Sequence, residues 1–156
     1  MLDKVDFPLT TSQISEFILD KGYTTYFRLQ SALSELTASS LLKVEATHNR
    51  TLYQLTEEGA ETIHYFKNKI SPDIREEIDT FLVEKMYDLR EEVSVKSDYY
   101  LNTNHEFEVK CEILENGSNL IDLRLTVPTE KEAQAIVSNW NLKNQEIYTS
   151  LLMKLL

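Results

Sequence analysis

Hydrogen-bond donors cluster around one turn and one hairpin tip in the first third of the chain. Arginine, hydroxyl and amide side chains of this kind contact base edges or phosphates in DNA. The candidates at the turn and on the helix after it are Thr24, Thr25, Tyr26, Arg28 and Ser31. The candidates at the hairpin tip are His48, Asn49 and Arg50. Their chemistry predicts a contact with double-stranded DNA.

Two short amphipathic helices are predicted to carry the turn, over about 11–20 and 25–38. Gly22 can take the left-handed conformation that ends the first helix, and Thr24 can cap the second. This is the plan of a helix-turn-helix, whose second helix can enter the major groove.

A β-hairpin follows, with strands predicted over 41–46 and 51–55. A third helix is expected over 57–69, capped by Thr56, and Gly59 near its start would let another backbone approach closely. The order helix, helix, strand, strand, helix predicts a winged helix-turn-helix, with the polar hairpin tip as the wing.

The chain is predicted to be an α+β protein of two modules, 1–70 and 71–156, with the boundary near Ser71. The first module is the winged helix-turn-helix. The second is expected to be a helix, a three-stranded antiparallel meander and a helix. Its elements are predicted over about 72–93, 97–102, 106–114, 118–127 and 130–155.

Two segments carry a resemblance to known regulators. Tyr53-Gln54-Leu55-Thr56-Glu57-Glu58-Gly59 resembles the passage from wing to helix in PadR-like and MarR-like transcriptional regulators. Phe7-Pro8-Leu9-Thr10-Thr11-Ser12-Gln13-Ile14, with Tyr23-Thr24-Thr25-Tyr26-Phe27 and Leu36, is similar to a Gram-positive bacterial winged-helix family of unknown function. The resemblance implies the fold, and it implies a helix before Phe7, of which Met1–Asp6 would be the shortened end.

Charge argues against the DNA interpretation. The net charge is −10, and residues 1–70 carry 7 Lys and Arg against 9 Asp and Glu, whereas residues 71–156 carry 9 against 17. An acidic protein is not attracted to DNA as a whole, so contact must come from a local patch. The cations available for such a patch are Lys21, Arg28, Lys43 and Arg50. The alternative is a protein-interaction module that keeps the fold but has little affinity for DNA.

Catalytic and metal sites are not expected. The three histidines show no i, i+4 pair, and the single Cys111 alternates with apolar residues as a buried strand thiol would. Since no nucleophile and base stand together, the sequence predicts neither an enzyme nor a metal or cofactor site. No apolar run reaches the roughly 20 residues of a membrane helix, and a cytoplasmic protein without a membrane partner is expected.

The second module is predicted to form a homodimer. The helices over 72–93 and 130–155 carry wide apolar stripes, and one of them, by preference the second, is expected at the interface. Asn144 in the stripe of the second helix is able to set the register of paired helices; the alternative is a stripe that fades into solvent there. A small-molecule effector is a further expected partner, although aromatics at strand and helix positions are more often plain core. The aromatics that could line its pocket are Tyr87, Tyr99, Tyr100, Phe107, Trp140 and Tyr148.

The register of the last hairpin can also be predicted. A three-residue loop, Glu115-Asn116-Gly117 with Gly117 left-handed, would place Cys111 opposite Ile121. This register pairs opposite charges across the strands. The neighbouring one opposes like charges and is rejected for that reason.

Overall fold

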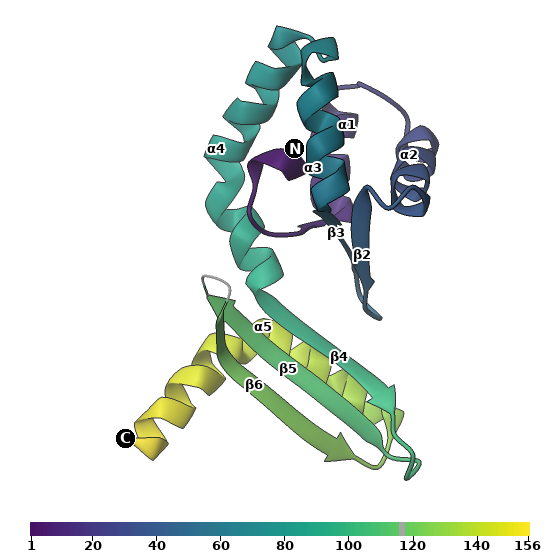
Figure 1. The fold of residues 1–156 in the computed structure, drawn as a ribbon. Helices are drawn as coiled ribbons and strands as arrows, with labels where there is room; N and C mark the ends of the chain where they lie inside the picture. Colours follow the sequence, from purple (N-terminus) through teal and green to yellow (C-terminus); the bar gives the residue numbers. More distant parts are fainter. Residues whose placement is uncertain (116–117) are drawn as a thin grey trace. The chain divides into compact units, whose positions relative to one another are not determined.

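The computed structural model describes residues 1–115 and 118–156. In this part of the chain it contains five α-helices and two three-stranded antiparallel sheets, which confirms the predicted α+β class (Figure 1). The chain divides into two compact units. The first comprises Met1–Ala46 and Arg50–Val93, and the second comprises Thr47–Asn49 and Ser94–Leu156.

The first unit contains four helices and the smaller sheet. The helices are α1 (Thr11–Asp20), α2 (Tyr26–Ala38), α3 (Glu57–Phe66) and α4 (Pro72–Ser94). The strands are β1 (Leu9–Thr10), β2 (Leu42–Ala46) and β3 (Thr51–Leu55), in the order β1-β3-β2. Single 3-10 turns lie at Leu2–Lys4 and Lys67–Lys69. β1 was not predicted, because two residues leave no periodic pattern.

Local side-chain contacts explain where these helices begin and end. Thr10 caps α1 in a capping box with Gln13, and Gly22 has the expected positive φ of 68° after α1. The N-cap of α2 is Thr25, not the predicted Thr24, and its side chain makes no capping hydrogen bond. Thr56 accepts a hydrogen bond from the backbone N–H of Gly59, as expected.

Gly59 is required by a close backbone approach. A Cβ atom built at this position would lie 2.2 Å from the carbonyl oxygen of Leu41, far inside van der Waals contact. The same carbonyl accepts hydrogen bonds from the backbone N–H and the hydroxyl of Thr56. The start of α3 is thereby held against the chain just before β2, which confirms the close backbone approach predicted at Gly59.

The core of the first unit comes from helices more than from strands. Phe17, Leu29 and Leu33 of α1 and α2 are buried with Leu9 and Leu52 of the sheet. The buried side chains of α4 belong to the same core; they are Ile78, Leu82, Leu89 and Val93. The sequence divided its modules near Ser71, whereas the first unit continues through α4 to Val93.

The second unit is a meander covered by one long helix. Its strands are β4 (Val95–Leu101), β5 (Phe107–Glu115) and β6 (Ser118–Val127), in the order β4-β5-β6. α5 (Glu130–Leu155) lies across one face of this sheet (Figure 1). It begins at Thr129, which forms the predicted capping box with Glu132.

The core of the second unit lies between β5 and α5. Val109, Cys111 and Ile113 alternate along β5 and are at most 3% exposed. Trp140 of α5 packs with them, 2% exposed. The predicted inward stripe of α5 holds past the buried Asn144 to Ile147, which packs against the core, and Leu151 is half-buried, but Leu155 near its end is exposed.

The predicted register of β5 and β6 is wrong. Cys111 lies opposite Leu123, not Ile121. Glu115 pairs directly with Ser118, and a β-bulge then shifts the register between Ile113 and Leu114. The extra residue of the bulge keeps the apolar side chains of both strands on the same face. The prediction had assigned this role to a three-residue loop. The predicted left-handed Gly117 lies outside the described residues.

The observed register is the one rejected for opposing like charges. Lys110 faces Arg124, and Glu112 faces Asp122. Neighbours on the same face relieve both oppositions. Lys110 Nζ lies 2.8 Å from Glu112 Oε1, and Arg124 lies 3.7 Å from both Glu108 Oε1 and Asp122 Oδ1. Pairs directly opposite therefore do not decide the register alone, since diagonal and same-strand neighbours are also within reach.

Candidate functional site

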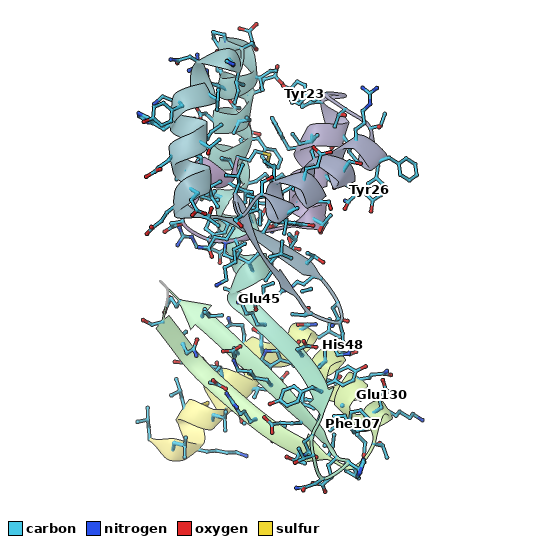
Figure 2. All side chains as sticks on the ribbon, turned by 45° about the vertical axis from the view of Figure 1, so that its right-hand side comes forward. Tyr23, Tyr26, Glu45, His48, Phe107 and Glu130 are labelled. Atoms are coloured by element: carbon cyan, nitrogen blue, oxygen red, sulfur yellow. The ribbon has the colours of Figure 1, made fainter. Side chains whose placement is uncertain are left out.

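The start of α2 presents polar and aromatic side chains to solvent. Thr25, Arg28 and Ser31 are exposed, whereas Leu29 and Leu33 on the opposite side of the helix are buried. Figure 2 shows Tyr23 in the turn and Tyr26 at the start of α2. Tyr26 is 52% exposed and Phe27 is 81% exposed. One helical turn therefore offers hydroxyls, a guanidinium and two aromatic rings.

Lys21, the cation next to this turn, forms an ion pair. Lys21 Nζ lies 2.9 Å from Glu77 Oε2, and the same oxygen accepts a hydrogen bond from the Tyr23 hydroxyl at 2.8 Å. Hydrogen bonds from Lys21 and then Tyr23 hold the pKa of Glu77 below its ordinary value. Lys21 also borders a cavity of about 440 Å³. Its other lining residues are Asp73, Glu76, Glu77, Thr80, Phe81 and Glu84.

Arg50, at the end of the hairpin tip, bonds within its own unit. Its Nη1 donates a hydrogen bond of 2.6 Å to the backbone carbonyl of Glu92. Burial lowers the pKa of Arg50, and the carboxylates of Glu92 and Glu45 oppose that effect. The guanidinium that was predicted to contact DNA thus has a structural contact to α4.

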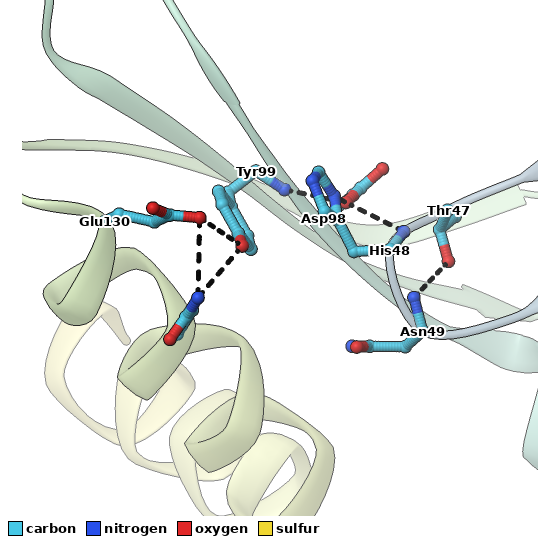
Figure 3. A network of polar contacts seen from close by, with 7 residues as sticks. Thr47, His48, Asn49, Asp98, Tyr99 and Glu130 are labelled. Carbon is cyan, nitrogen blue, oxygen red and sulfur yellow. Dashed lines mark hydrogen bonds and ion pairs between the residues drawn. The ribbon is translucent and has the colours of Figure 1, made fainter.

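The hairpin tip Thr47–Asn49 takes part in a polar network of the second unit (Figure 3). His48 Nδ1 lies 2.5 Å from Asp98 Oδ1. The His48 ring stacks on the Tyr99 ring, with 4.2 Å between centroids and 12° between planes. The Tyr99 hydroxyl donates to Glu130 Oε1 at 3.1 Å. The imidazole is therefore held by a carboxylate on its edge and an aromatic ring on its face.

The eight predicted site residues fall into three groups. Five surround the start of α2 in the first unit, and of these Thr24 is half-buried. His48 and Asn49 belong to the second unit, and Arg50 belongs to the first. The α2 group is the largest of the three, and all five of its residues belong to the first unit.

The partners of His48 were not predicted. Asp98 and Tyr99 lie about fifty positions further along the chain, and no spacing rule links a hairpin tip to a distant strand. Tyr99 was weighed only as a core or pocket aromatic, and it is buried as a core residue. The tight polar tip Thr47-His48-Asn49 was the one local signal available.

The other chemical candidates are placed as follows. Cys111 is buried, and burial raises the pKa of its thiol to about 11. Within residues 1–115 and 118–156, no group of three or more His, Cys, Asp or Glu gathers as a metal site would. Of the aromatics weighed as a pocket, Trp140 is core, Tyr100 is exposed, and Tyr87 is exposed on α4 of the other unit. In the same described residues, every helix is too short or too polar to cross a bilayer.

The fold therefore defines an α+β protein of two units. One unit exposes the start of a helix, and the other is a meander covered by a helix. Residues 1–155 match the family model described as Domain of unknown function (DUF4364), and the chain belongs to this family. No curated protein and no solved structure matches it significantly.

Proposed function

We propose that the chain is a winged-helix DNA-binding protein that acts as a dimeric transcriptional regulator. The order of elements in the first unit supports this. α1 and α2 are joined at a left-handed Gly22, the hairpin β2–β3 follows, and β1 pairs with β3 to complete a small sheet. This is the arrangement expected of a helix-turn-helix with a wing.

The observation that carries the proposal is the outward surface of α2. Arg28 and Ser31 are exposed one turn apart, and Thr25 precedes them at the N-cap. An arginine at the start of a recognition helix can donate two hydrogen bonds to guanine, and hydroxyls donate to bases or phosphates. Helix N-terminal residues are the ones that meet base edges in helix-turn-helix proteins.

Charge limits the affinity that this surface can provide. The net charge of −10 opposes long-range attraction, and Lys21 is already paired with Glu77. Non-specific affinity is therefore expected at or beyond the weak end of the usual range of about 10⁻⁴–10⁻⁶ M. Recognition then depends on short-range contacts around Arg28, and a dimer doubles their number.

Fluorescence anisotropy at low salt, with a pool of labelled genomic fragments, tests the proposal. Arg28→Ala should weaken binding to a selected fragment by about 1–3 kcal/mol and relax its sequence preference. Lys131→Ala is the matched control, because it removes the same charge from the start of α5. If no fragment binds, or if both variants weaken binding equally, the contact through α2 is refuted.

A protein-interaction module is the second candidate. Phe27 and Tyr26 expose aromatic surface beside Arg28, and aromatics with arginine are typical of protein interfaces. His48 and Arg50, the other predicted DNA contacts, are engaged within the protein. Phe27→Ala separates the two functions: it should abolish capture of a protein partner, but change DNA affinity less than Arg28→Ala does.

A further inference from the structure

The two edges of the second sheet differ in what covers them. Thr47–Asn49 lies against the β4 edge, through the contacts of His48 with Asp98 and Tyr99. At the other edge, β6 pairs with β5 alone among the described strands. β6 runs for ten residues, Ser118–Val127. An edge strand of this length presents a row of backbone donors and acceptors that another strand can pair with.

The apolar face of the sheet is covered less completely at β6 than at β5. On β5, Val109, Cys111 and Ile113 are at most 3% exposed beneath the helix. On β6, Ile121 and Leu123 are only half-buried, and Leu125 is 38% exposed. Burial thus falls off toward the open edge, although the inward side chains stay aliphatic. An added strand there would extend this face.

The sequence of β6 is complementary to itself in an antiparallel pair. If Leu123 faces Leu123 of a second copy, each Asp122 lies opposite Arg124 of the other copy. Ile121 then lies opposite Leu125 on the apolar face. Opposite charges and aliphatic side chains directly across a ladder both stabilise it. The two-fold axis repeats each contact, so the complementarity counts twice.

The neighbouring registers lack this property. A shift by one residue would place the apolar side chains of one copy on the polar face of the other. The two face-preserving shifts centre the pair on Asp122 or on Arg124, and each opposes two identical charges at the axis. Of these registers, only the one centred on Leu123 keeps the apolar faces together, opposes Asp122 to Arg124 and places no like charges at the axis.

We propose that β6 pairs antiparallel with β6 of a second copy about a two-fold axis at Leu123, forming a continuous six-stranded sheet. The proposal deepens, and rests on, the dimer of the proposed function. It places the interface on a strand edge and not on the stripe of α5. The occupant is another copy of this chain, since Asp122 and Arg124 make the edge its own charge complement.

Sedimentation of the full chain without DNA, at micromolar concentrations, tests the interface. The wild type should sediment at twice its 18.2 kDa mass. Asp122→Arg should raise the dimer dissociation constant at least about tenfold, because each new arginine meets Arg124 of the other copy. The monomer should stay folded, because within the chain residue 122 faces Glu112 and the substitution removes a like-charge opposition.

Restoring complementarity provides the decisive control. The double variant Asp122→Arg with Arg124→Asp should recover the dimer, since the opposite charges are exchanged but still paired. Leu123→Cys should form a covalent dimer on oxidation, because opposed residues place their Cβ atoms within disulfide range. Leu125→Cys should not, because it faces Ile121. Wild-type Cys111 is buried and should not cross-link either.

Several results would overturn the proposal. They are a monomeric wild type, an Asp122→Arg variant that dimerises like the wild type, or a double variant that stays monomeric with an unchanged circular dichroism spectrum. Met153→Lys with Leu155→Lys tests the end of α5, where both side chains are 80% exposed. Loss of the dimer there, with Asp122→Arg unaffected, would place the interface on the helix. Anisotropy with DNA remains a separate measurement, so failure of DNA binding is distinguishable from failure of this interface.

Discussion

Each of the two sheets has three described strands, but the units around them are stabilised differently. In the first sheet the strands are two to five residues long, and most buried side chains around it, such as Phe17, Leu33 and Leu82, come from helices. In the second sheet the strands are seven to ten residues long. There the alternating residues of β5 pack against one helix, centred on Trp140.

This difference indicates what each unit depends on. The first unit distributes the helical part of its core over α1, α2 and α4, and its most constrained point is a backbone contact, Gly59 against Leu41. The second unit concentrates its core in one strand–helix layer with one large side chain. Truncating a side chain should therefore affect the second unit most, whereas adding a methyl group should affect the first.

The largest effect is expected for Trp140→Ala. The indole is buried at 2% exposure, and removing an aromatic side chain from a core costs about 3–5 kcal/mol. Urea unfolding followed by circular dichroism should show this loss. Leu142→Ala on the same helix, 82% exposed, should change the unfolding free energy by less than about 0.5 kcal/mol. Equal effects of the two variants would contradict a core centred on Trp140.

Gly59→Ala should destabilise the first unit by about 1–3 kcal/mol. The new Cβ would lie 2.2 Å from the Leu41 carbonyl oxygen, so the backbone must shift. Gly22→Ala is the comparison, because its Cβ would meet nothing within 4 Å and only its φ of 68° is unfavourable. That variant should lose about 1 kcal/mol. A smaller loss for Gly59→Ala than for Gly22→Ala would show that the close approach is easily relaxed.

The smallest effect concerns pH and Cys111. Burial raises the thiol pKa from 9.0 to about 11, so the folded chain holds this proton more tightly than the unfolded chain. The contribution of this thiol to the free energy of unfolding is fully present below pH 9 and is lost as the pH rises toward 11. At pH 9.5 the loss should be under about 1 kcal/mol. Cys111→Ala should lack this part of the pH dependence, and an identical pH profile in both proteins would refute the assignment.

Local signals made much of the fold predictable. Gly22, Thr56 and Thr129 mark helix ends through contacts within a few residues, and the burial of Cys111 followed from alternation along one strand. Such features depend on residues close by in the sequence, so they can be predicted from a single sequence. The extension of the first unit through α4 depended on distant packing, and the sequence placed the boundary earlier.

Features set by distant contacts were missed. β1 owes its existence to pairing with β3 some forty positions away. The β5–β6 register depended on a bulge and on diagonal charges, neither of which direct pairing considers. At the candidate site, the exposed residues of α2 followed from helical periodicity. The contacts of His48 did not, since they join the hairpin tip to Asp98 and Tyr99.

The burial of Trp140 has a spectroscopic consequence. It is the only tryptophan of the chain, and its indole N–H donates to the backbone carbonyl of Glu112 at 3.4 Å. An indole enclosed by aliphatic side chains emits at shorter wavelength than one in water. The native emission therefore reports on the packing of α5 against β5, and a red shift marks the loss of that layer. The chain thus carries a built-in fluorophore for its second unit.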